Sequence, residues 1–241
     1  MSRRNSSPAA TGAAQIAPTR HHVGKDVAAF LRQAETIAPS GAARGRLVFA
    51  LDATMSRQPT WDLACHLQAS LFEAAAKAGG LDVKLSYFRG RDEARASGWV
   101  RNPNQLEALM GRISCRGGLT QIDRILQHAA AEARRSPLAA LVYVGDTMEE
   151  DIDRLCTTAG ELALRNTRAF MFLEGQDQTA EAAYREIARI TGGVFLRFDP
   201  QAAARLRALL EAIGTYAAGG RTALEATGTR EARELLADLR P

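Results

Sequence analysis

The sequence predicts an α/β fold in which a doubly wound, mostly parallel sheet is flanked by helices. Short apolar runs recur along the chain, and stretches with helical periodicity separate them. Two of these runs, at 46–52 and 139–145, are almost entirely apolar, as is typical of strands buried on both faces. Alternation of strands and helices favours parallel pairing through crossover connections. Because such crossovers are right-handed, we expect a Rossmann-like layout.

The chain begins with a segment that lacks a globular composition. Residues 1–24 are rich in Ser, Ala, Pro and Arg without periodicity, which predicts a disordered basic tail. A helix is expected at 25–37, where Val27, Phe30 and Ile37 share one face. This helix and a linker are expected to occupy 25–45.

The first strand, at 46–52, precedes a helix expected at about 61–78, which Gly79 and Gly80 end. An alternating apolar pattern predicts the next strand at 82–88, and a short partner strand follows at 94–100. The later strands are expected at 139–145, 167–173 and 193–198. The later helices are expected at 104–112, 121–135, about 149–165, about 178–191 and about 201–217.

Two further interpretations concern the second half of the chain. Thr147 and Glu150 fit the spacing of a capping box, so Glu149, Glu150 and Asp151 are assigned to the dipole of a helix beginning at about 149 and not to a metal. The folded domain is expected to span 46–218. Residues 219–241 should form a helical extension, which either docks on the domain or recruits a partner helix.

Charge and cysteine content narrow the functional classes. The net charge is +4, but the first 25 residues hold four basic residues and no acid, and the remainder balances at 27 of each sign. This distribution argues against a nucleic-acid-binding domain, which would carry its charge on a folded face. The three cysteines form no CxxC pair, which argues against a zinc site or a disulfide framework. Since no apolar stretch is long enough to span a bilayer, we expect a cytoplasmic protein without membrane segments.

Polar oxygen donors follow the two most apolar strands. Asp52 ends the first strand, and Thr54 and Ser56 follow at alternate positions, where extended backbone would point all three side chains the same way. Asp146 follows the strand at 139–145, and Thr120 lies after a Gly-rich turn, just before a helix. Carboxylate and hydroxyl oxygens are hard ligands, which select Mg²⁺, Mn²⁺ or Ca²⁺ over zinc or copper.

These pieces resemble the von Willebrand factor type A (VWA) domain, in particular its bacterial intracellular type. That family carries a metal-ion-dependent adhesion site (MIDAS) written D-x-S-x-S…T…D, and this chain matches it at Asp52, Thr54, Ser56, Thr120 and Asp146. Thr54 replaces the commoner Ser but keeps the hydroxyl. The resemblance implies that these side chains hold a divalent cation, some through water, and that an acidic residue of a protein partner completes the cation's coordination. It also implies a role beside an ATPase, as in metal-chelatase complexes.

Other interpretations stay open. The same Mg²⁺ could serve phosphoester hydrolysis, or a metal could only stabilise the strand-end loops. A haloacid-dehalogenase-like phosphatase would need a second Asp where Thr54 stands, so we expect no catalytic residues. Arg57, Arg89 and Arg91 are expected as exposed charges on this face, where they would favour an acidic partner. Glu174 and Asp177 follow a strand end at the same face, and they are expected in a solvated loop, with a role at the rim of the site as the alternative.

Overall fold

The computed structural model describes residues 44–57, 69–198 and 203–239. The predicted tail at 1–24, the predicted helix at 25–37 and the first half of the helix at 61–78 lie outside the described residues. The predicted division of the chain into four segments therefore stays a prediction.

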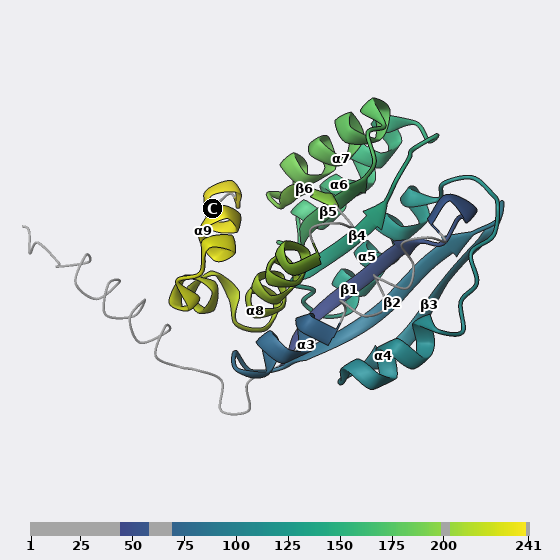
Figure 1. Cartoon of the computed structure of the whole chain (residues 1–241). Coiled ribbons are helices and arrows are strands. Elements are labelled where there is room, and N and C mark those ends of the chain that lie inside the picture. Colours follow the sequence, from purple (N-terminus) through teal and green to yellow (C-terminus); the bar gives the residue numbers. More distant parts are fainter. Residues whose placement is uncertain (1–43, 58–68, 199–202, 240–241) are drawn as a thin grey trace, which may run out of the picture. The chain divides into compact units, whose positions relative to one another are not determined.

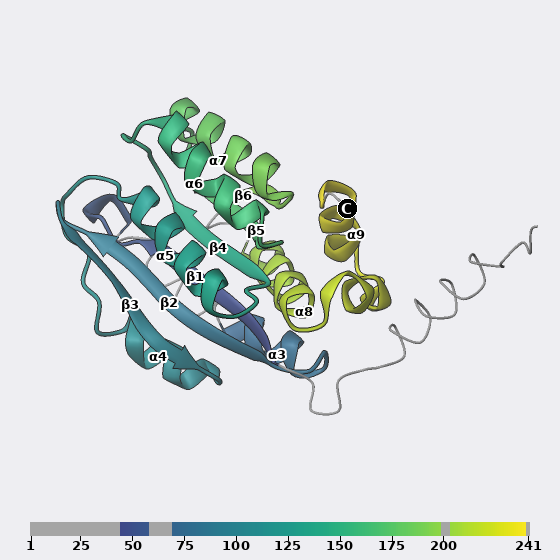
Figure 2. The same cartoon turned by 180° about the vertical axis from the view of Figure 1, so that it is seen from behind.

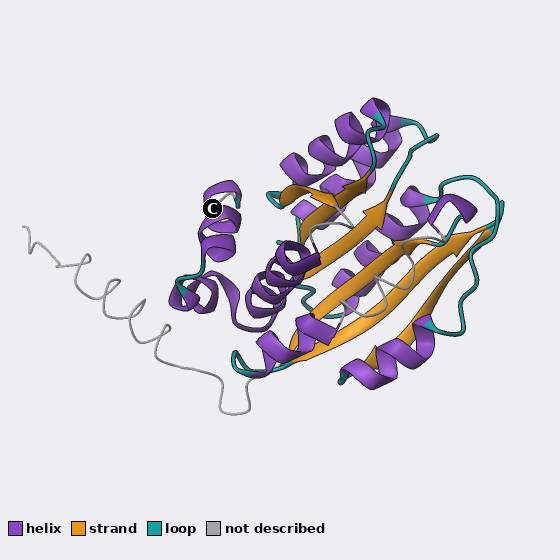
Figure 3. Ribbon diagram, viewed as in Figure 1, coloured by secondary structure: helices purple, strands orange, loops and turns teal. Residues whose placement is uncertain are grey.

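The described residues form a six-stranded sheet with the order β3-β2-β1-β4-β5-β6 (Figure 3). Its strands are β1 (Gly45–Asp52), β2 (Leu81–Arg89), β3 (Glu93–Val100), β4 (Ala140–Gly145), β5 (Arg168–Glu174) and β6 (Val194–Phe198). All neighbours pair in parallel except β2 and β3, which pair antiparallel. The doubly wound α/β fold is confirmed. The short partner strand expected at 94–100 is β3.

Helices cover both faces of this sheet. They are α3 (Ala69–Ala76), α4 (Pro103–Met110), α5 (Ile122–Arg135), α6 (Ile152–Ala163), α7 (Gln178–Thr191), α8 (Ala203–Thr227) and α9 (Arg230–Asp238). Helices α3, α4 and α8 lie over one face, and α5, α6 and α7 lie over the other (Figures 1 and 2). None of the helices in the described part of the chain combines the length and the apolar character that a membrane span requires.

Alternation along the central strands fills two cores. In β1, Leu47 and Phe49 pack with the α3, α4 and α8 layer, whereas Val48 and Ala50 pack with the α5, α6 and α7 layer. All four side chains are at most 2% exposed. Full burial of a large apolar side chain stabilises a fold by about 1.5–3 kcal/mol, so both layers fix the position of β1 and of the loop that follows it.

The expected helix at about 149–165 begins later than predicted. Helix α6 starts at Ile152, and Asp151 is its cap, since the Asp151 side chain accepts a hydrogen bond from the backbone N–H of Arg154 at 2.9 Å. The capping box at Thr147–Glu150 is therefore wrong. Glu150 instead accepts hydrogen bonds from the N–H groups of Ile122 and Asp123, so it caps the preceding helix, α5.

The C-terminal residues dock on the domain. Helix α8 runs past the predicted boundary and bends at Gly220, whose φ of 70° is accessible to glycine without strain. Helix α9 follows, and its Leu235 joins Leu224 and Leu239 in the core beneath α8. Of the two alternatives for this extension, the structure shows docking.

A buried carboxylate ties α5 to the sheet. The side chain of Glu132 is 3% exposed and pairs with Arg46 at 3.0 Å and with Lys84 at 2.9 Å. Burial raises the pKa of Glu132, but the hydrogen bond and charge of Lys84 outweigh it, so the pKa lies below its usual range. These two ion pairs join α5 to the neighbouring strands β1 and β2.

Candidate metal centre

The sheet reverses its winding direction between β1 and β4. The strand β2 lies on one side of β1 and β4 lies on the other, which makes the carboxyl ends of β1 and β4 a topological switch point. Leu51 is in register with Val144, so Asp52 and Asp146 follow at the same edge of the sheet. Ligands of open α/β sheets bind in the crevice outside such strand ends.

The chain turns sharply as it leaves β1. One carboxylate oxygen of Asp52 accepts a hydrogen bond from the backbone N–H of Thr54 at 2.7 Å, and a 3-10 turn follows at Met55–Arg57. The hydroxyls of Thr54 and Ser56 lie 3.1 Å apart. The expectation of extended backbone here is wrong, yet the turn brings the two hydroxyls together.

Thr120 is fixed to the loop after β4 by two hydrogen bonds. Its N–H donates to the Glu149 carboxylate at 2.8 Å, and its hydroxyl accepts from the Glu149 N–H at 3.1 Å. Gly118 allows the Thr120 loop to lie against the β2–β3 turn, because a Cβ there would be 1.9 Å from the carbonyl oxygen of Gly90. Backbone contact of this kind excludes any residue with a side chain unless the loop moves.

Two carboxylate oxygens at this edge lack a hydrogen-bond partner among the described residues. They are one oxygen of Asp52, a side chain that is 0% exposed, and one oxygen of Asp146. Burial, followed by the nearby Asp146, raises the pKa of Asp52 to about 6, although hydrogen bonds from Thr54 and the charge of Arg57 oppose the shift. Buried acceptors without partners are costly, and a cation is a suitable partner for them.

Hydroxyls make up much of the polar group at this edge of the sheet. Within the described ranges, no group of three or more His, Cys, Asp and Glu side chains is placed to hold a metal. A shallow depression of about 160 Å³ lies over the strand ends. Its lining includes Thr54, Ser56, Thr120, Thr147 and Glu149. Two carboxylates with hydroxyls suit a hard divalent cation better than a soft one.

The structure buries Arg57, which was predicted to be exposed. It is 0% exposed and forms an ion pair with Glu174, the last residue of β5. The interpretation of Arg57 as an exposed charge is therefore wrong, and so is that of Glu174 as a solvated loop residue. The prediction of an exposed Arg89 is wrong too, because its side chain is half-buried and forms an ion pair with Glu93 at 3.0 Å. Arg91 is exposed, as predicted.

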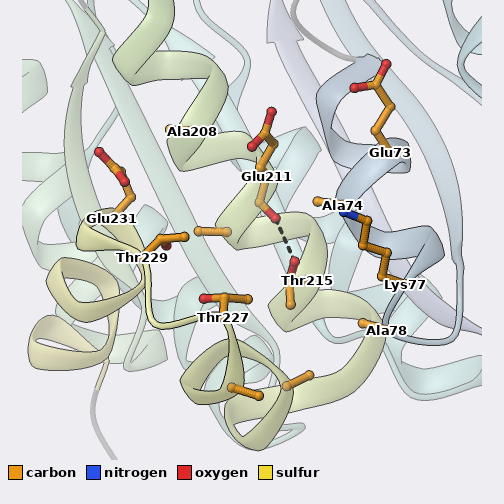
Figure 4. A pocket seen from close by; sticks show the side chains of 13 residues that line it. Glu73, Ala74, Lys77, Ala78, Ala208, Glu211, Thr215, Thr227, Thr229 and Glu231 are labelled. Atoms are coloured by element: carbon orange, nitrogen blue, oxygen red, sulfur yellow. Dashed lines mark hydrogen bonds between the residues drawn. The ribbon is translucent and has the colours of Figure 1, made fainter.

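A larger hollow lies elsewhere on the domain. It measures about 650 Å³ between α3, α8 and α9, and its polar lining includes Glu73, Lys77, Glu211 and Glu231 (Figure 4). These side chains are spread around the hollow, and the hydroxyl of Thr215 donates to the backbone carbonyl of Glu211 at 3.0 Å. None of the five predicted site residues lines it.

No protein-family model and no curated protein matches the chain. Solved structures do match its fold. A von Willebrand factor type A protein from Catenulispora acidiphila aligns with a TM-score of 0.55 and 19% identity, over 72% of this chain and 43% of that chain. The SpRpn10 VWA domain aligns with a TM-score of 0.54 and 14% identity, over 68% of this chain and 94% of that domain.

A third match carries a metal. Proximal thread matrix protein 1 from the mussel byssus, described with a zinc-occupied MIDAS motif, aligns with a TM-score of 0.58 and 12% identity, over 79% of this chain and 52% of that chain. The chain thus spans about half or less of the length of two of these three proteins. At such identities the matches show the fold, and the fold is that of a VWA domain.

Proposed function

We propose that this protein is a non-catalytic interaction module that binds an acidic side chain of a protein partner through a divalent cation. One observation carries the proposal. At the topological switch point, two buried carboxylate oxygens without a hydrogen-bond partner among the described residues lie at the same edge of the sheet as a pair of hydroxyls. The residues assigned to the cation, directly or through water, are Asp52, Thr54, Ser56, Thr120 and Asp146.

Each of these residues has a defined part in the site. Asp52 and Asp146 supply negative charge, while Thr54, Ser56 and Thr120 supply neutral oxygens. A bound cation would supply a Lewis-acidic position that an external carboxylate can occupy. Because the donor set carries only two formal charges, it does not exceed the charge of a divalent cation, which could still accept an external carboxylate as a further ligand. Mg²⁺ is our first choice, with Mn²⁺ and Ca²⁺ as alternatives, and the zinc of the mussel protein makes Zn²⁺ a necessary comparison.

The surroundings of the depression suit a protein surface. Met55, which lines it, is 58% exposed, and Leu119, beside Thr120, is 53% exposed. Two exposed apolar side chains beside the depression offer a partner apolar surface to contact. We therefore propose a partner in which the acidic residue is flanked by apolar side chains.

Calorimetric titration tests the metal site. Wild-type protein should bind one equivalent of Mg²⁺ or Mn²⁺, and Asp52→Ala should abolish the binding. Asp153→Ala is the matched control, because Asp153 is exposed on α6 and does not line the depression. Equal titrations of wild type and Asp52→Ala would show that the site is assigned wrongly.

A comparative pull-down tests the partner. Wild type should retain a protein from a cytoplasmic extract in Mg²⁺ and release it in chelator, and Asp52→Ala should not retain it. We propose a cytoplasmic location and an ATPase or chelatase-like assembly as the setting, so mass spectrometry of the retained protein tests this part too. Metal-dependent turnover of a phosphoester, lost in Asp52→Ala, would favour a hydrolase instead.

A further inference from the structure

Arg57 is the largest fully buried side chain of the described residues. It follows Ser56 directly, and its backbone N–H donates to the carbonyl of Thr54 at 3.1 Å, closing the turn that carries the site hydroxyls. A buried charge is stable only when other charges and hydrogen bonds compensate it. The position of Arg57 therefore calls for negative groups close by.

The ion pair with Glu174 fixes the path of the Arg57 side chain. Arg57 follows β1 and Glu174 ends β5, and the sheet order places β4 between those strands. To reach Glu174, the guanidinium must extend across the carboxyl end of β4, where Asp146 follows Gly145. Adjacent strands are about 4.8 Å apart, so the side chain crosses the edge of the sheet that holds Asp52 and Asp146.

The electrostatic surroundings agree with this path. Burial lowers the pKa of Arg57, and the charges of Asp146 and Asp52 oppose that shift. The phenol rings of Tyr143 and Tyr184 pack beneath the same strand end, with their rings 5.4 Å apart. Both tyrosines are 0% exposed, and buried surroundings of low dielectric strengthen the coupling between nearby charges.

We propose that Arg57 is an internal counter-ion of Asp52 and Asp146, which stabilises the strand-end loops without metal and weakens the affinity for a divalent cation. The inference rests on the proposed function, since it concerns the same site. Asp52, Asp146 and Glu174 carry three negative charges against the single positive charge of Arg57. A divalent cation would neutralise the remaining two.

Two measurements test the proposal. In Mn²⁺ titrations, Arg57→Gln should bind the metal at least about tenfold more tightly than wild type, because it removes a neighbouring positive charge. Arg57→Lys, which keeps the charge, should stay near wild type. Arg207→Gln is the control, since it removes an arginine that is exposed on α8 and does not line the depression over the strand ends. Unchanged or weaker Mn²⁺ binding by folded Arg57→Gln would overturn the proposal.

A double-mutant cycle in chelator tests the counter-ion role without metal. Arg57→Gln should lower the unfolding temperature strongly in the wild-type background and much less in an Asp52→Asn background. If Arg57→Gln alone does not fold, the double variant should still fold, and failure of both would overturn the proposal. Equal effects in the two backgrounds would do so too. If wild type binds no Mn²⁺, the proposed function fails, while this cycle still decides the role of Arg57.

Discussion

Replacing Asp52 by Asn should stabilise the metal-free protein and abolish its stabilisation by metal. Burial and Asp146 raise the pKa of Asp52 from 3.8 to about 6. One pKa unit corresponds to about 1.4 kcal/mol, so ionised Asp52 destabilises the metal-free folded state by about 3 kcal/mol. Asparagine keeps an acceptor for the Thr54 N–H and carries no charge. We therefore expect a gain of about 1–3 kcal/mol in the free energy of unfolding in chelator at pH 7.5.

The direction of the Asp52 pKa shift determines how the stability of the metal-free protein depends on pH. The folded-state pKa of Asp52 lies above its unfolded value, so the unfolded state releases the proton first as pH rises. In chelator, this group therefore lowers wild-type stability progressively between about pH 4 and pH 6. The advantage of Asp52→Asn should be small at pH 4 and should reach its full size above pH 6.

Urea unfolding followed by circular dichroism measures these differences. In Mn²⁺ at one hundred times its dissociation constant, wild type should gain about 2.7 kcal/mol, whereas Asp52→Asn should gain almost nothing. Asp153→Asn controls for loss of a surface charge. An Asp52→Asn variant that is less stable than wild type in chelator at pH 7.5 would refute the reasoning.

Three further predictions follow from single positions. Gly118→Ala should weaken Mn²⁺ binding in titrations, because its Cβ would clash with backbone, whereas Gly117→Ala, with open space at that position, should bind as wild type does. Glu132→Gln should lower the free energy of unfolding at pH 7 by about 2–4 kcal/mol. Because the folded pKa of Glu132 is depressed, wild type should lose that contribution as pH falls through it, which a pH series of urea unfolding would detect. Met55→Ser should weaken partner retention in pull-downs without changing Mn²⁺ affinity, whereas Leu164→Ser, at a side chain that is 88% exposed on another surface, should change neither.

Local sequence patterns were sufficient to predict the sheet. Apolar runs mark β1 and β4 because both faces of these strands are covered, and the paired glycines mark the end of α3. The topology then implies that residues following β1 and β4 meet at one edge. Thr54 and Ser56 meet there, as predicted, although a 3-10 turn and not extended backbone brings them together.

Those local patterns could not predict side-chain partners that lie far apart in the sequence. Glu150 has the spacing of a cap for α6, but the chain places its carboxylate at the start of α5, which precedes it in the sequence. Arg57 is charged and follows a strand end, which indicates exposure. Instead it is paired with Glu174, which ends a strand on the far side of β4. No local pattern encodes either pairing, since each depends on how strands far apart in the sequence are ordered in the sheet.

The loops around the site are held by protein contacts, which bears on what a metal would do there. Thr120 and Glu149 bond to each other twice, Glu150 caps α5, and the Thr147 hydroxyl donates to Asp177 at 2.7 Å. If a metal served only to stabilise these loops, its removal should unfold them. With these bonds in place, we expect hydrogen-exchange protection of the loops to change little when chelator is added, while partner binding is lost. A broad loss of protection at Thr120 and Glu149 in chelator would instead indicate a structural metal, because the protein contacts would then be insufficient.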